Sequence, residues 1–140
     1  MPAPANVDTV DNGQAGLAEQ GDEVVFTFAG AVDPDLVLAG WDGSATSVTV
    51  RITGAGSDVL TVRNAANTAQ LTELGSVDTN GDYADTADFS GSQMTLSGNT
   101  ITIVLGTPTG TVNRDPSAKT MVWTTPQGQA TESGHPDSNF

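Results

Sequence analysis

Apolar and polar residues alternate along several short stretches of this chain, which is the pattern of β-strands with one face in a core. These stretches span residues 22–30, 45–54, 57–65, 92–106 and 120–125. In the clearest of them, Val48, Val50 and Ile52 fall on one face, while Thr49 and Arg51 fall on the other. The alternation therefore predicts an all-β protein.

Turn residues between these stretches predict how neighbouring strands are joined. Gly54-Ala55-Gly56 separates two alternating runs, and Ser97-Gly98-Asn99 separates two others, so both sites predict hairpins. In the second hairpin, Met94 and Leu96 should face Ile101, Ile103 and Leu105 across the core. A weaker strand is expected over residues 69–77, with a bend at Gly75.

A single short helical turn is predicted over residues 33–40. Asp33 suits the N-cap, Pro34 suits the first helical position, and Gly40 is a natural stop. Trp41 follows directly, and we expect it to close one end of the domain rather than to offer an exposed platform for a sugar.

Taken together, these elements predict an immunoglobulin-like antiparallel β-sandwich of roughly seven or eight short strands with extended termini. Residues 1–21 are expected to form an N-terminal arm, residues 22–126 the sandwich, and residues 127–140 a C-terminal tail. The polar, turn-rich segments 78–91 and 107–119 are predicted to be loops.

The net charge of the chain limits the classes of molecule that it can bind. Its 140 residues include 17 acidic and 4 basic ones, so the formal net charge is −13. Such a field repels phosphate backbones and anionic lipids, and we expect neither nucleic acid nor membrane as a partner. The chain has no cysteine, which excludes disulfides and thiolate chemistry. Its first twenty residues lack the basic and apolar regions of a signal peptide, and we expect use without export.

Residues that could carry catalysis are scarce, and we predict no enzyme, no catalytic residue and no cofactor. The single histidine, His135, lies in the polar tail, where we expect it to be solvated. Neither a nucleotide-binding loop nor a zinc-protease motif is present. A hydrolase that uses surface carboxylates is disfavoured, because no constellation of residues supports it.

The segment that begins at Asp78 resembles the opening of a calcium loop, with oxygen ligands at alternate positions. The match ends at Tyr83 and Phe89, which stand where such a loop needs Gly and Glu. A looser surface site using Asp78, Asp82 and Asp85 stays open, although an ordinary solvated turn is favoured and no metal site is predicted. The segment Asp78–Asp88 could equally contact a partner.

Two resemblances bear on function. The run FTFAGAVDPDLVLAGWDG, the alternating strands after it and the late TMVWTT strand resemble bacterial immunoglobulin-like domains of surface and adhesive proteins. This resemblance implies an adhesive or spacer module at the bacterial cell surface. In style, the Cys-free, acidic, Ala-, Gly- and Thr-rich chain also resembles decoration proteins of tailed-phage virions.

The second resemblance implies the function that we expect: a non-enzymatic capsid decoration or cementing protein on the capsid exterior. Its partners would be the major capsid protein, copies of itself, or both, in a symmetric multi-copy assembly or homo-oligomer. The terminal segments should contact these partners through apolar side chains, namely Val7, Val10, Leu17 and Phe140.

Overall fold

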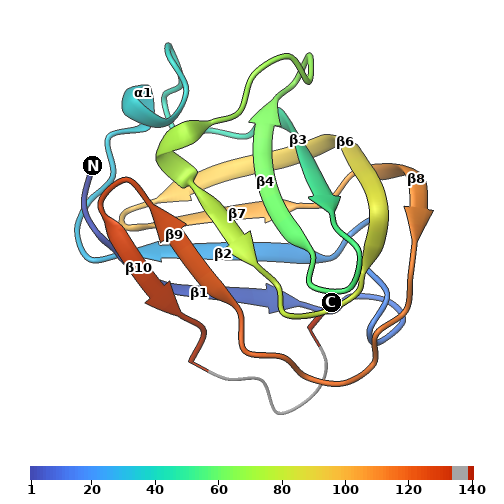
Figure 1. The fold of residues 1–140 in the computed structure, drawn as a ribbon. Coiled ribbons are helices and arrows are strands. Elements are labelled where there is room, and N and C mark those ends of the chain that lie inside the picture. The colour runs from blue at the N-terminus through green and yellow to red at the C-terminus, as the bar shows by residue number, and fades with distance from the viewer. Residues whose placement is uncertain (134–138) are drawn as a thin grey trace.

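Ten strands and two short helical turns make up residues 1–133 and 139–140, which the computed structural model describes (Figure 1). The strands are β1 (Pro4–Val10), β2 (Glu23–Phe28), β3 (Thr46–Thr53), β4 (Val59–Asn64), β5 (Ser76–Asp78), β6 (Ala84–Ser97), β7 (Thr100–Val104), β8 (Thr107–Val112), β9 (Val122–Thr125) and β10 (Gly128–Thr131). The helical turns are α1 (Pro34–Val37) and the 3-10 turn η1 (Thr72–Leu74).

The strands form one antiparallel sheet in the order β1-β2-β7-β6-β3-β4-β5-β9-β10, with β8 paired to β6. Because β1 also lies against β9 and β10, the two ends of this order meet and the sheet is nearly closed into a barrel (Figure 1). The all-β, antiparallel prediction is confirmed. The described residues form ten strands in one continuous sheet, so a division of seven or eight strands between the two sheets of a sandwich is not confirmed.

The predicted local elements around the best alternating runs are confirmed. In the hairpin of β3 and β4, Arg51 lies opposite Thr61, and in the hairpin of β6 and β7, Met94 lies opposite Ile103. The α1 turn begins as predicted, because the Asp33 side chain accepts a hydrogen bond from the backbone N–H of Asp35.

Within residues 69–77, the predicted strand is shorter than expected. Residues 72–74 form η1 instead, and only Ser76–Asp78 form a strand. Gly75 bends the chain between them with φ of 61°, and a Cβ there would lie 1.8 Å from the carbonyl oxygen of Thr124. Only glycine fits this close approach to β9.

Two segments predicted to be loops are strands. Residues 84–91 form the first half of β6, which pairs with β3 on one side and β8 on the other. A shift of register between Ala84 and Thr86 breaks the two-residue period, so Ala84 and Ala87 are both buried although they are three apart. Residues 107–112 form β8, which is mostly exposed and therefore lacks an apolar alternation.

The expected arm and tail also contribute strands. Residues 4–10 of the arm form β1, and residues 128–131 of the tail form β10. Val7 occupies one inward position of these strands, but small or polar residues such as Thr9 and Ala130 occupy others. Such residues give little apolar signal, which explains why the sequence pattern did not mark these strands.

The centre of the core is aromatic. The Trp123 ring of β9 lies 4.9 Å from the ring centroids of both Phe26 and Phe28 of β2. Its indole N–H donates to the backbone oxygen of Leu74 at 2.7 Å, so its one polar atom is satisfied inside the core. The first and last thirds of the chain are therefore joined through this cluster.

Candidate functional site

The residues predicted to bind a partner lie in different environments. Val7 and Phe140 are fully buried, whereas Val10 and Leu17 are half-buried. The side chains of Val7 and Phe140 pack within the core and present no surface to a partner in this structure. Contact with a partner through Val10 and Leu17 stays a prediction.

Phe140 is held inside the domain by its backbone and its ring. Its backbone oxygen accepts a hydrogen bond from Gly16 at 2.8 Å, and its ring meets the buried Tyr83 ring edge-on at 5.1 Å. The neighbouring Asn139 donates to both carboxylate oxygens of the buried Glu132. The last two residues thus contribute to stability, while His135 lies outside the described residues.

The three carboxylates considered for a loose calcium site belong to two different hydrogen-bond networks. Asp78 accepts hydrogen bonds from Ser57 and from the backbone of Asn80. Asp82 and Asp85 instead share the side-chain amide of Asn113, at 2.9 and 3.2 Å. An amide nitrogen stands between these two carboxylates, and Asp78 belongs to a different network.

A fourth acidic residue near this segment, Asp58, fixes its path. Asp58 is fully buried, and its Oδ2 accepts hydrogen bonds from the backbone N–H groups of Tyr83 and Ala84 at 2.6 and 2.8 Å. Its backbone oxygen also accepts from Thr79. The carboxylate therefore holds the chain where β6 begins.

A different acidic cluster lies in the loop between β1 and β2. One carboxylate oxygen from each of Asp11, Glu19 and Asp22 lies within 4.8 Å of the others, the only such group of metal-ligand side chains in the described part of the chain. Oxygen ligands of this kind suit a hard cation such as Ca²⁺. Both Asp22 oxygens, however, already accept backbone N–H groups, from Asn12 and Glu19.

The buried member of this cluster has an unusual acidity. Burial raises the pKa of Asp22 from 3.8 to about 6, and the negative charges of Asp11 and Glu19 add to this effect. The two backbone hydrogen bonds oppose it without cancelling it. The sequence alone did not mark this cluster, because its members are brought together only when the loop folds back on itself.

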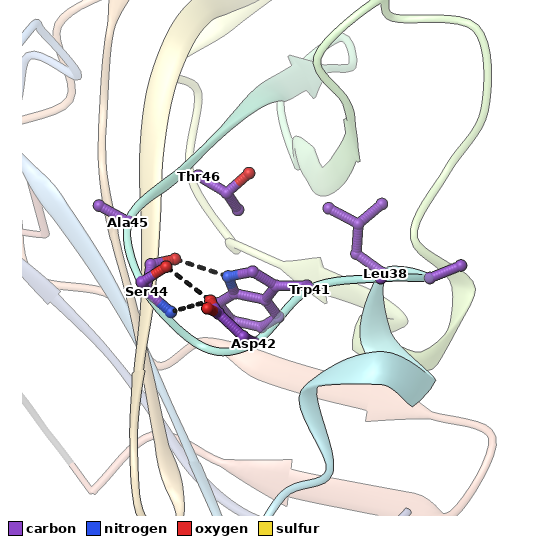
Figure 2. A pocket seen from close by; sticks show the side chains of 8 residues that line it. Leu38, Trp41, Asp42, Ser44, Ala45 and Thr46 are labelled. Carbon is purple, nitrogen blue, oxygen red and sulfur yellow. Dashed lines mark hydrogen bonds between the residues drawn. The ribbon is translucent and has the colours of Figure 1, made fainter.

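A pocket of about 290 Å³ lies between α1 and the start of β3 (Figure 2). A single stretch of chain lines it, with Leu38, Ala39, Gly40, Trp41, Asp42, Ser44, Ala45 and Thr46. The Trp41 indole N–H donates to the backbone oxygen of Ser44 at 2.6 Å, which folds this stretch into a tight loop. Trp41 is only 7% exposed, so it closes this end of the core and offers no flat face for a sugar to stack on.

Asp42 supplies the charge at this pocket. Its Oδ1 accepts hydrogen bonds from both the hydroxyl and the backbone N–H of Ser44, at 2.6 and 3.0 Å (Figure 2). These two bonds hold the pKa of Asp42 below its ordinary value, so the side chain is ionised at neutral pH. The pocket is thus small, negatively charged and fixed in shape by internal hydrogen bonds.

The comparisons with known proteins leave the structure itself as the guide to function. Within the described residues, no helix has the length and apolar character needed to cross a lipid bilayer. No protein-family model, no curated protein and no solved structure matches this chain.

Proposed function

We propose that this protein is a non-enzymatic structural protein of a virion, which decorates or cements the outer capsid surface of a tailed bacteriophage. The observation that supports this most is the inclusion of both β1 and β10 in one nearly closed sheet. A folded surface that is already ordered loses little conformational entropy when it binds. Such a surface suits a protein that is present in many copies and stabilises a shell.

The strong acidity of the chain supports an exterior position. A net charge of −13 disfavours contact with packaged DNA and leaves protein as the natural partner. The partners in this proposal are the major capsid protein and neighbouring copies of this chain. A decorating protein would contact them through its folded faces. A standard protein–protein interface buries about 1,600 Å² in total.

The relationship to immunoglobulin-like domains is part of the same proposal. It is supported by β2, which is followed by the Asp33-Pro34 turn of α1.

The test is to locate the protein in its native source. Virus particles and cell envelopes would be purified separately, labelled with an antibody against this domain, and imaged by electron microscopy. Regular labelling of capsids at symmetric positions is expected. Labelling of cell envelopes without labelling of particles would refute the virion role and favour an adhesive or spacer module of a bacterial surface protein.

A further inference from the structure

We infer that the Asn12-Gly13 pair, in the loop between β1 and β2, is a site of spontaneous covalent modification that loosens this loop. The Asn12 amide is converted to aspartate or isoaspartate, with water as the only co-reactant. The chain contains one further Asn-Gly pair, Asn80-Gly81, which the fold protects from the same reaction. The inference goes beyond the proposed function and does not depend on it.

The reaction joins two groups that are adjacent along the chain. The backbone nitrogen of Gly13 attacks Cγ of Asn12, a C–N bond forms, and Nδ2 leaves as ammonia with the proton from the glycine nitrogen. Water then opens the cyclic imide at Cγ to give aspartate, or at the backbone carbonyl carbon to give isoaspartate. No electrons are transferred, and the added water and the released ammonia balance the atoms. Glycine favours the attack because it has no Cβ and its backbone turns freely.

The surroundings of Asn12-Gly13 favour this attack. Both residues are exposed. The N–H of Gly13 donates to Oδ1 of Asp11 at 2.9 Å, so the proton that must leave the nitrogen already points at a carboxylate that can accept it. This hydrogen bond joins residues only two apart, so breaking it disturbs no contact between distant segments. The attacking nitrogen therefore lies at the surface, beside a base.

The surroundings of Asn80-Gly81 oppose the same attack. Gly81 is buried, its N–H donates to Oγ1 of Thr79 at 3.3 Å, and its carbonyl oxygen accepts from the backbone N–H of Asp58 at 2.9 Å. A Cβ on Gly81 would lie 2.6 Å from the Tyr83 ring, so this ring packs directly on the glycine. Movement of Gly81 toward the Asn80 side chain would break these contacts and leave buried polar groups unpaired. The same dipeptide is thus exposed in one turn and fixed in the other.

The Asn12 amide closes the loop between β1 and β2. Its Nδ2 donates to the backbone oxygen of Gly21 and to Oε2 of Glu23, both at 3.0 Å, and so joins the start of the loop to its end. A carboxylate at this position cannot donate either bond, and it repels the Glu23 carboxylate. Isoaspartate also adds an atom to the main chain beside Gly13. Conversion should therefore open the loop.

The rates at the two pairs test the selectivity. The purified full chain would be incubated for several weeks in mildly alkaline buffer, either folded or unfolded in guanidinium chloride. Peptide mapping by mass spectrometry would measure aspartate and isoaspartate at both positions. In the folded chain, Asn12 should convert at least about tenfold faster than Asn80, because only the reaction at Asn80 requires buried groups to lose their partners. In the unfolded chain the two rates should be similar.

The substitution N12D tests the consequence for the loop, and N80D is its matched control. Each variant introduces the aspartate product at one pair without the wait for the reaction. Hydrogen exchange measured by NMR would follow the N–H of Gly16, which donates from the middle of the loop to the backbone oxygen of Phe140 at 2.8 Å. Exchange of Gly16 should become about tenfold faster in N12D and stay unchanged in N80D. The indole N–H of Trp123 inside the core should stay protected in both variants.

Several results would overturn the inference. An Asn12 rate equal to or below the Asn80 rate in the folded chain would show that the fold does not direct the reaction to Asn12. The same preference for Asn12 in the unfolded chain would assign the selectivity to local sequence, and no conversion of Asn12 over the whole incubation would exclude the site. Equal protection of Gly16 in N12D and the wild type would show that the amide does not hold the loop closed.

Discussion

Replacing Asp22 with Asn tests whether a buried carboxylate makes this protein less stable as the pH rises. Burial raises the pKa of Asp22 from 3.8 to about 6 in the folded state, whereas the unfolded chain keeps the ordinary value. Between these two pH values the folded state holds a proton that the unfolded state has released. The free energy of unfolding therefore falls as the pH rises from about 4 to about 6.

The size of this effect follows from the change in pKa. A shift from 3.8 to about 6 corresponds to at most about 3 kcal/mol between the two ends of the window. Asn does not ionise, so D22N should lose this part of the pH dependence. Asn also lacks one of the two oxygens that accept from Asn12 and Glu19, which subtracts about 1 kcal/mol at every pH. The test is therefore how the free energy of unfolding changes with pH, and not its value at any one pH.

The measurement is urea unfolding of the wild type and of D22N across the pH range that includes both pKa values. The difference between their free energies of unfolding should change by up to about 3 kcal/mol within the window and stay constant above it. D11N is the matched control: it removes one neighbouring charge, which lowers the folded-state pKa of Asp22, and should lower the upper end of the window without abolishing it. Parallel curves for the wild type and D22N would refute the reasoning.

Three further predictions concern stability. D58A should lower the free energy of unfolding by about 3 kcal/mol, because the buried N–H groups of Tyr83 and Ala84 lose their acceptor. D58N keeps one oxygen and should cost clearly less. Equal losses for D58A and D58N in urea unfolding would contradict this prediction. F140A should cost about 3 kcal/mol in the same assay, and a loss below about 1 kcal/mol would mean that the ring is not held in the core. Raising NaCl from about 0.1 to about 1 M shortens the Debye length from about 10 to about 3 Å. The repulsion between acidic side chains in a chain of net charge −13 is then screened, so calorimetry should give a higher Tm. A constant Tm would contradict this prediction.

Large apolar residues at alternate positions made the central strands predictable from the sequence. Phe26 and Phe28 marked β2, and Val48, Val50 and Ile52 marked β3, because each of these side chains is buried on one face. The α1 turn was predictable for a different reason, since its cap and its first helical residue are adjacent in the sequence. Local chemistry was enough in each case.

The remaining strands carry a weaker local signal. Small or polar residues fill inward positions in β1, β6 and β10, as Thr9, Ala84 and Ala130 show. The register shift in β6 also breaks the alternation on which the prediction depends. The pattern shows which face of a strand is buried but not which strand lies beside it, so the adjacency of β1 to β9 and β10, and with it the barrel, could not be predicted.

The candidate sites were predicted in part. Trp41 is buried at one end of the core as expected, but the pocket beside it depends on the hydrogen bond to Ser44, which only the folded loop shows. The cluster at Asp22 likewise depends on a loop that brings residues 11, 19 and 22 together. Spacing along the chain gave no hint of either contact, since neither follows a regular period.

The contact of Trp123 with Phe26 and Phe28 has a consequence for how the protein is made. β2 leaves the ribosome well before β9, so the two phenylalanine rings emerge without the ring that covers them in the finished domain. The nascent chain must keep this aromatic surface from other chains until residue 123 has left the exit tunnel. Translation that stops before β9 would release a polypeptide with a permanently uncovered core, which chaperones and proteases would treat as misfolded.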